Sequence, residues 1–153
     1  MKILGIDPGS EESALFGWDN EKEELFCDAR KVENDKVFNY YKHNFDVVVC
    51  EMIASYGMPV GKSIFNTCVW IGRFWQASPI PFETVLVKTI RAHHCGNARA
   101  KDGNVIQALK DRFEPDLKPR QRPKGLFKGV SRDVWQAAST AIYWGDMEKI
   151  GIK

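Results

Sequence analysis

Three acidic residues stand where a folded chain would bring carboxylates together. Asp7 follows a short apolar run that ends at Ile6, and Glu51 follows an unbroken apolar run at 47–50. Asp133 stands at the start of a helical pattern near the end of the chain. Ligand sites of α/β sheets form at strand ends, and carboxylates gathered there repel each other and lose hydration unless a cation compensates. We therefore expect the three acids to form a divalent-metal site.

The chemistry suited to such a site is phosphodiester hydrolysis. Carboxylate and water oxygens are the ligands that Mg²⁺ and Mn²⁺ prefer. Where two such ions are held side by side, one activates the attacking water and the other stabilises the leaving oxygen. Each acid alone has a plainer interpretation as a turn or cap residue, and Asp7-Pro8-Gly9 is typical of a turn. The joint placement of all three favours the metal site.

Five strands are expected to position these acids. The first three, at 2–6, 13–18 and 24–32, are separated by short turns, which favours consecutive antiparallel pairing. The run at 46–51 is apolar throughout its centre, as expected of a strand buried on both faces. A fifth strand is expected at 83–88. The acids at positions 7 and 51 would then end two strands of one sheet.

Helical spacing of apolar residues predicts the remaining elements. Helices are expected at 35–44, at 62–77, at 101–113 and from Ser131 to about Trp144. The order of strands and helices indicates an α/β fold with a mixed five-stranded sheet flanked by helices. A length of 153 residues fits a single domain, 1–153, with one sizeable core.

Charge is unevenly distributed along the chain although its net value is only +2. The segment 118–132 contains no acid, and it lies mostly within an expected loop at 117–129. Its basic residues are Lys118, Arg120, Arg122, Lys124, Lys128 and Arg132. Such a tract on a nearly neutral protein suggests a polyanionic partner, and a solvated loop is the equally weighted alternative.

Composition excludes several other classes. No apolar stretch approaches the length of a membrane span, and the short apolar run before Asp7 is not a signal peptide, so a cytoplasmic location and no membrane partner are expected. The four cysteines form no CxxC pair, which argues against disulfides. A zinc site at His93-His94-Cys95 is disfavoured because no second ligand pair accompanies it.

Four segments in order resemble the RuvC family of Holliday junction resolvases, and together they span nearly the whole chain. They are ILGIDPGS at 3–10, VVCE at 48–51, Val87-Lys88 with GNARAK at 96–101, and DVWQAA at 133–138. The resemblance implies an RNase H-like fold and a Mg²⁺-dependent crossover-junction endodeoxyribonuclease of DNA recombination and repair. It also implies that Asp7, Glu51 and Asp133 are the catalytic acids and bind two Mg²⁺ ions, with Mn²⁺ as a possible substitute.

Basic and aromatic residues are further candidate DNA contacts, and the family resemblance covers two lysines among them. Lys88 matches the first family lysine directly, whereas Lys101 matches the second only approximately because Asp102 stands at the family position. Either lysine is expected to contact DNA or to offset charge developing on the phosphate, the plainer interpretation being an exposed lysine. Tyr56, in a loop at 55–61, can stack on bases or simply cover the core edge. Further candidate DNA contacts are Arg99, Arg120, Arg122, Lys124 and Lys128.

Gln136 is the main departure from the family. Cellular members carry a second acid one helical turn after the position of Asp133, and here the glutamine brings no charge. The change would weaken one metal position, alter metal preference or abolish cleavage. Trp135 and the long basic tract look more like the resolvase-like proteins of phages.

The family also implies a homodimer with two active sites that face the two scissile strands of a four-way junction. The expected helix at 62–77 is the candidate contact surface, because its large apolar residues occupy more than one side. Those residues are Phe65, Val69, Trp70, Phe74 and Trp75. Core packing is the alternative explanation.

Three rival functions stay open at this stage. A module that binds branched nucleic acid without cutting it would still need the basic tract, but would not need two metal ions. Another RNase H-like nuclease, acting on RNA–DNA hybrids or flaps, would share every motif. A phosphotransferase of the actin and sugar-kinase type is disfavoured, because it normally needs two such domains and the chain has no P-loop. Substrate preference, cleavage sequence and metal preference are not specified by the motifs.

Overall fold

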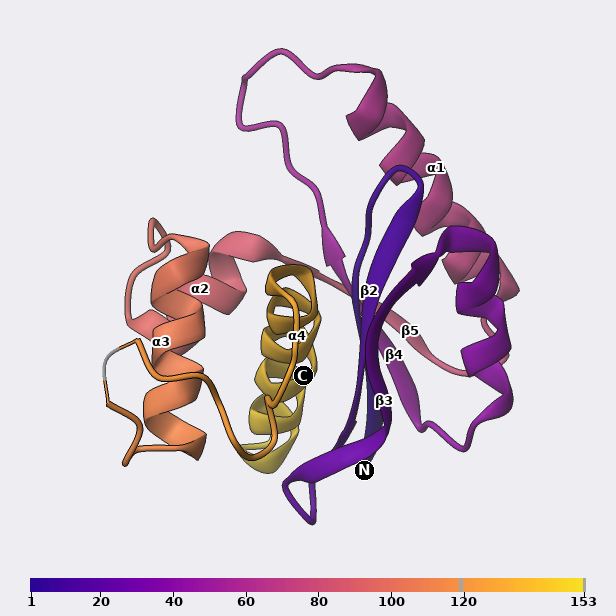
Figure 1. Cartoon of the computed structure of the whole chain (residues 1–153). Coiled ribbons are helices and arrows are strands. Elements are labelled where there is room, and N and C mark those ends of the chain that lie inside the picture. Colours follow the sequence, from indigo (N-terminus) through magenta and orange to yellow (C-terminus); the bar gives the residue numbers. More distant parts are fainter. Residues whose placement is uncertain (119, 153) are drawn as a thin grey trace.

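The computed structural model describes residues 1–118 and 120–152 as a five-stranded sheet with helices on both faces (Figure 1). The elements in chain order are β1 Lys2–Asp7, β2 Glu12–Asp19, β3 Glu24–Glu33, the 3₁₀ helix η1 Asn34–Lys42, β4 Val47–Met52, α1 Lys62–Ala77, β5 Phe82–Leu86, α2 Val87–Cys95, α3 Asp102–Phe113 and α4 Arg132–Lys149. No helix in the described part of the chain is long and apolar enough to cross a membrane.

The sheet has the strand order β3-β2-β1-β4-β5. Strands β1, β2 and β3 form an antiparallel meander, and β4 and β5 continue the sheet in parallel with β1. The predicted mixed sheet is therefore confirmed. The antiparallel part follows from the short turns between the first three strands, whereas the parallel part requires η1 and α1 as crossovers.

Alternation of side chains along the strands divides the core into two clusters. Ile3, Val47 and Val49 face the layer of α2, α3 and α4, whereas Leu4 and Val48 face the layer of α1 and η1. The continuous apolar run in β4 is explained by this arrangement, because a central strand is buried on both faces. Residues two apart along β1 and β4 consequently point into the same layer.

Helix α4 lies directly on β1 at Gly5. A Cβ atom at Gly5 would lie 2.2 Å from the carbonyl oxygen of Ala137 and 2.8 Å from the Cβ of Ala141, so only glycine permits this approach. The helix extends to Lys149, beyond the expected end near Trp144. Small residues on both elements thus bring the helix unusually close to the strand that ends in Asp7.

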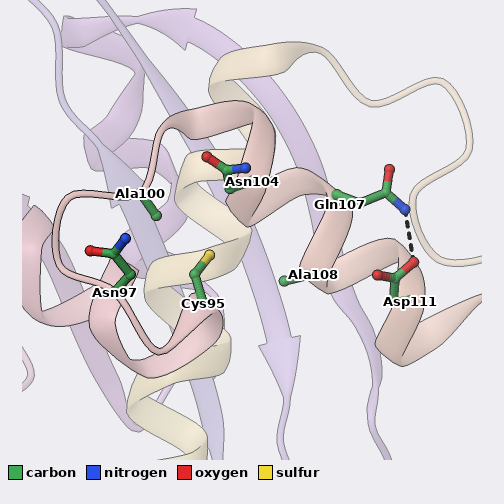
Figure 2. Close-up of a pocket in the computed structure, with 7 residues that line it drawn as sticks. All are labelled: Cys95, Asn97, Ala100, Asn104, Gln107, Ala108 and Asp111. Atoms are coloured by element: carbon green, nitrogen blue, oxygen red, sulfur yellow. Dashed lines mark hydrogen bonds between the residues drawn. The ribbon is translucent and has the colours of Figure 1, made fainter.

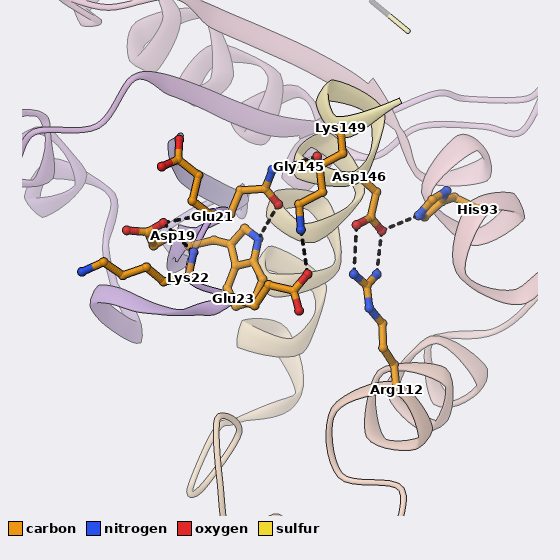
Figure 3. A network of polar contacts seen from close by, with 11 residues as sticks. Asp19, Glu21, Lys22, Glu23, His93, Arg112, Gly145, Asp146 and Lys149 are labelled. Carbon is orange, nitrogen blue, oxygen red and sulfur yellow. Dashed lines mark hydrogen bonds and ion pairs between the residues drawn. The ribbon is translucent and has the colours of Figure 1, made fainter. Parts of the chain in front are cut away.

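Polar contacts fix the C-terminal half of α4 to its neighbours (Figure 3). Asp146 accepts hydrogen bonds from both terminal nitrogens of Arg112 on α3, at 2.6 and 2.9 Å, and lies 2.8 Å from Nε2 of His93 on α2. Lys149 pairs with Glu23 in the β2–β3 turn at 2.6 Å. These contacts join α2, α3 and the hairpin to one helix, and so set where the opposite, N-terminal end of α4 lies.

Several elements differ from the sequence-based expectation, and helix α2 was not expected at all. The fifth strand ends at Leu86 rather than at position 88, and α2 begins at Val87, so Lys88 lies in the first helical turn. Gly96, with φ of 66°, ends α2 in the left-handed conformation that glycine adopts readily. The segment expected as an α-helix at 35–44 is a 3₁₀ helix.

Candidate active site

Asp7 and Glu51 lie side by side at the carboxyl ends of two parallel strands. The preceding residues, Ile6 of β1 and Cys50 of β4, are partners in the parallel register. Asp7 continues the row of Ile3 and Gly5, and Glu51 continues the row of Val47 and Val49, so both side chains point toward the layer that contains α4. The register and the pleat of the sheet therefore place the two carboxylates together.

Asp133 enters from the first turn of α4, above the same strand ends. Because Ala137 sits over Gly5, the residue one turn before Ala137 extends toward the end of β1. Lys31, which lies in one row with Asp7 across the sheet, contacts Asp133 at 2.8 Å, and the charge of Asp133 is among the causes that raise the pKa of Asp7. The structure thus places the three acids at the same end of the sheet.

Electrostatics make the pair at the strand ends costly to ionise. Burial, with added repulsion from Glu51, Asp133 and Asp102, raises the pKa of Asp7 to about 8. Burial raises the pKa of Glu51 to about 7, with Asp102 adding to the rise and Arg91 opposing it. No hydrogen bond from the described residues contributes to either shift. Two partly buried carboxylates without donors are a donor set that fits a divalent cation.

A lysine that the sequence did not single out reaches this cluster across the sheet. Asp7 pairs with Ala14 of β2, and Ala14 pairs with Lys31 of β3, so the three residues form one row on one face. Ala14 is small enough for the lysine to extend over it. The ammonium nitrogen of Lys31 lies 2.8 Å from Oδ2 of Asp133 and 3.7 Å from Oε2 of Glu12.

Arg91 of α2 and Asp102 of α3 complete the cluster. Nη2 of Arg91 donates to Oδ1 of Asp102 at 2.6 Å, and Nη2 of Arg132 lies 3.3 Å from Oδ2 of the same carboxylate. Four acids thus meet three basic side chains at this end of the sheet.

In the present side-chain conformations, residues 1–118 and 120–152 contain no group of three Asp, Glu, His or Cys side chains close enough to enclose a metal ion. Lys31 would have to release Asp133 before that acid could join a shared ion.

Lys88 and Tyr56 lie at the edge of the cluster and contact each other. The ammonium nitrogen of Lys88 is 3.5 Å from the centre of the Tyr56 ring, a cation–π geometry. The backbone at Tyr56 forms a tight turn: Tyr56 and Gly57 have φ of 45° and 79°, and the NH of Met58 donates to the carbonyl of Ser55 at 2.9 Å. Lys88 lies one turn before Arg91 on α2 and so shares its face.

The remaining predicted contacts are dispersed around this centre. Lys101 is the residue before α3, where its NH donates to Oδ1 of Asn104 at 2.9 Å, and its side chain is exposed. Arg99 is exposed between α2 and α3. The basic loop is also exposed at its charged positions, which are Lys118, Arg120, Arg122, Lys124 and Lys128.

The basic loop is anchored although it has no regular structure. The Glu114 carboxylate accepts hydrogen bonds from the NH groups of Lys124 and Gly125 at 2.9 and 2.8 Å. Phe127, only 1% exposed, stacks on Trp135 of α4 with ring centres 4.0 Å apart. The loop therefore holds its charges at a defined place before α4.

A separate cleft between α2 and α3 has a volume of about 320 Å³ (Figure 2). Its lining residues are Cys95, Asn97, Ala100, Asn104, Gln107, Ala108 and Asp111. It contains none of the acids described above, so the candidate chemistry lies outside it.

Comparison with solved structures identifies the architecture. RuvC of Thermus thermophilus superposes with a TM-score of 0.69 at 15% identity, covering 99% of this chain and 97% of that one. The fold is that of RuvC. The T. thermophilus RuvC in complex with a Holliday junction substrate superposes with a TM-score of 0.71 at 14% identity and the same coverage. No protein-family model and no curated protein sequence matches the chain. The RuvC-like, RNase H-type sheet is thus established by structure rather than by sequence.

Proposed function

We propose that this protein is a divalent-metal-dependent endonuclease that cuts branched DNA, with the four-way Holliday junction as its substrate. The observation that carries the proposal is the pairing of Asp7 and Glu51 at adjacent strand ends, with Asp133 above them on α4. The RuvC-like fold over 99% of the chain supports it, because a solved RuvC of that fold is bound to a Holliday junction.

In this function the three acids would hold Mg²⁺ or Mn²⁺, two ions being the expectation from the resemblance. Such ions would supply an activated water and would stabilise the leaving oxygen. The chain's own groups then have separable tasks. The carboxylates orient the ions, and Lys88 at the rim offers a positive charge to a phosphate beside them.

The DNA would approach across Lys88 and Tyr56 and along the basic loop. Arg120, Arg122 and Lys124 are exposed and form no ion pair within the described residues, so they are free to contact phosphates. Tyr56 offers a half-exposed ring at a tight turn, suited to stacking on a base at an opened junction.

A homodimer is part of the proposal. Phe65 and Val69 lie one turn apart on α1 and are 59% and 62% exposed, and Trp75 is 56% exposed. Phe74 is buried, Trp70 is partly buried and Trp75 stacks on the buried Phe82, so core packing does not account for the exposure of Phe65 and Val69. Val69→Glu is expected to shift the sedimentation of the protein from dimer to monomer, and a monomeric parent protein would refute this part.

The decisive experiment incubates the protein with a four-way junction, a linear duplex and an RNA–DNA hybrid, each with Mg²⁺, Mn²⁺ or EDTA. Metal-dependent, paired nicking of the junction alone supports the proposal, and Asp7→Asn should abolish it while leaving junction binding intact. Cleavage of the hybrid or of every substrate would retain a nuclease and refute junction selectivity.

A second candidate function is binding of branched nucleic acid without cleavage. Two observations favour it: Gln136 in place of a further acid, and the engagement of Asp133 by Lys31. Tight junction binding with no nicking in either metal would support this alternative, and Lys31→Met and Gln136→Asp would then be the first changes to test for activity.

A further inference from the structure

Lys31 contacts one of the three acids proposed to hold a metal ion. Its Nζ atom lies 2.8 Å from Oδ2 of Asp133. The other two basic residues of the cluster, Arg91 and Arg132, both pair with Asp102. The arginines therefore neutralise an acid outside the proposed ligand set, whereas the lysine neutralises one inside it. An ion that binds Asp133 through this oxygen must displace the lysine.

The contact between Lys31 and Asp133 is open to solvent. The two side chains are 41% and 48% exposed. Lys31 starts from the outer strand β3 and extends over Ala14, which is only 1% exposed, on the face of the sheet that α4 covers. Ala14 is in turn the partner of Asp7, the last residue of β1. The ammonium group is thus accessible to a polyanion that approaches the carboxyl end of β1.

The ammonium group of Lys31 is also held loosely. Asp133 accepts a hydrogen bond from it, but Oε2 of Glu12, at 3.7 Å, is too distant to accept one. Ion pairs exposed to this degree change an equilibrium constant by about fivefold at most. A DNA phosphate accepts charge-assisted hydrogen bonds from lysine as a carboxylate does, so it can replace Asp133 as the partner at little cost.

A phosphate bound at the three acids would lie within reach of Lys31. A divalent ion shared by a carboxylate and a phosphate holds their oxygens at most about 4 Å apart, since each oxygen lies about 2 Å from the ion. The flexible stem of a lysine side chain spans a shift of this size by rotation about its own bonds. The movement that releases Asp133 therefore brings the ammonium group to the phosphate.

We propose that Lys31 is a phosphate-binding residue of the active site, which leaves Asp133 for the DNA backbone when a junction binds. This inference rests on the proposed function. The exchange moves the ammonium group from one anionic oxygen to another, so its charge stays within the site. It also frees the carboxylate of Asp133. Binding of DNA consequently favours binding of a divalent ion, and by linkage the ion favours binding of DNA.

The test measures binding of a synthetic four-way junction to the full chain in EDTA, by fluorescence anisotropy at several salt concentrations. Lys31→Met is expected to weaken binding about threefold or more, and to lower the slope of log affinity against log salt by about 0.9, the value of one phosphate contact. Lys31→Arg keeps the charge and should retain both values.

The matched control is Arg30→Met. Arg30 is the neighbouring residue of β3 and is also paired with a carboxylate, that of Asp28. Its partner in the register is Leu15, which belongs to the core cluster on the side of α1 and η1, so Arg30 points to the opposite face of the sheet from Lys31. Junction affinity and salt slope should stay at the parent values in this variant.

The salt slope separates a phosphate contact from simple neutralisation of Asp133. If Lys31 stays on Asp133 in the complex, Lys31→Met will weaken binding by exposing the acid but will leave the slope unchanged, and the inference is overturned. Asp133→Asn should tighten binding with the slope unchanged, because the lysine already contacts DNA in the parent. A slope that rises by about 0.9 in Asp133→Asn would show that Lys31 reaches DNA only in the variant, which also overturns the inference. Should Lys31→Met fail to fold, Lys31→Gln gives the same comparison.

Addition of Ca²⁺, which takes carboxylate ligands, tests the linkage between ion and DNA. The gain in junction affinity should be about two- to fivefold larger in the parent than in Lys31→Met, because only the parent has an ion pair to exchange. An equal gain in both proteins would contradict the exchange.

Failure of this inference is distinguishable from failure of the proposed function. Tight junction binding by the parent with an unchanged slope in Lys31→Met refutes the role of Lys31 alone. A lowered slope in Lys31→Met without metal-dependent nicking supports the phosphate contact and refutes the nuclease. Absence of junction binding by the parent refutes both.

Discussion

The ammonium nitrogen of Lys31 lies 2.8 Å from Oδ2 of Asp133, across 102 positions of sequence. The contact exists because Lys31, Ala14 and Asp7 are aligned across three strands and Ala14 is too small to block the lysine. A side chain from the outermost strand thereby reaches the helix that contributes an acid to the candidate site. Lys31 and a metal ion would compete for the same carboxylate.

Replacing Lys31 should therefore tighten metal binding. Lys31→Met frees the Asp133 oxygen and removes a positive charge from the cluster, so Mn²⁺ affinity is expected to rise about two- to fivefold, the value of a partly exposed ion pair. Titration calorimetry measures the change, with Lys36→Met on η1 as the control. Weaker Mn²⁺ binding in Lys31→Met would show instead that the lysine orients Asp133.

Removal of the Asp7 charge should stabilise the protein in EDTA at alkaline pH. The pKa of Asp7 in the folded protein is about 8, above its ordinary value of 3.8, so its contribution to stability is complete in acid and is lost as pH rises toward 8. Asp7→Asn cannot ionise and should melt about 2 °C or more above the parent at pH 9. Thermal unfolding from pH 5 to pH 9 measures this, with the exposed Asp116→Asn as control. Parallel curves for Asp7→Asn and the parent would contradict the repulsion described at the strand ends.

The contact between Tyr56 and Lys88 should make the two residues interdependent in DNA binding. Tyr56→Leu removes both the stacking surface and the support of the ammonium group, so junction affinity should fall about fivefold or more, whereas Tyr56→Phe should retain it. The same change in a Lys88→Met background should have a smaller effect. Fluorescence anisotropy with a labelled junction completes this double-mutant cycle, with the exposed Met58→Ala as control. Strictly additive effects would show that the ring and the lysine act independently.

Acid should unfold the protein through the contacts between α2 and α4. Burial lowers the pKa of His94 to about 4, and hydrogen bonds from Arg112 and His93 lower the pKa of Asp146 despite its burial. A group whose pKa is depressed by folding loses its stabilising contribution as pH falls from its ordinary value to its folded one. Stability should therefore decline between pH 6.5 and 4, and less steeply in His94→Gln. Urea unfolding across this range measures the decline, with the exposed His43→Gln expected to follow the parent. An equally steep decline in His94→Gln would remove His94 from this explanation.

The basic loop should account for much of the salt dependence of DNA binding. Changing Arg120, Arg122 and Lys124 to Gln is expected to weaken junction binding and to lower the slope of log affinity against log salt by about 0.9 for each phosphate that the protein no longer neutralises. Anisotropy titrations at several salt concentrations give the slope. Neutralising Lys36 and Lys42 on η1, across the sheet, should leave it unchanged. An unaltered slope in the loop variant would place the loop away from the DNA.

The sequence was sufficient to predict the acids that end strands. Apolar runs before Asp7 and Glu51 indicate where β1 and β4 end, and parallel strands of one sheet end on the same side. Asp133 was predictable because a helical pattern begins beside it. Local patterns were enough for these positions, since each acid directly adjoins the element that places it.

The basic members of the cluster could not be predicted in the same way. Lys31 depends on the β2–β3 register, which shifts between Phe16 and Trp18, and a bulge of this kind leaves no clear signal in composition. Arg91 lies on α2, a helix of nine residues that follows β5 without a loop. The strand expected at 83–88 therefore included the first residues of this helix. Both residues act across elements distant in sequence, and only the assembled sheet and helices bring them to the acids.

The basic loop was predicted as a loop, but its anchoring was not. The nearly complete burial of Phe127, among basic and glycine residues, has no periodic context from which to infer it. Its partner Trp135 stands next to Gln136, so the aromatic stack that fixes the loop also holds the start of α4.

Gly5 gives the candidate site a determinant that has no side chain. The gap between the end of β1 and the start of α4 is set by the thickness of bare backbone at this residue, where even one methyl group would collide with Ala137. A substitution at Gly5 would therefore act as a spacer, pushing Asp133 away from Asp7 while every acid stayed in the sequence. Variants at this position would mimic the loss of a carboxylate. Mutagenesis restricted to acidic and basic residues would therefore overlook the residue that sets the width of the site.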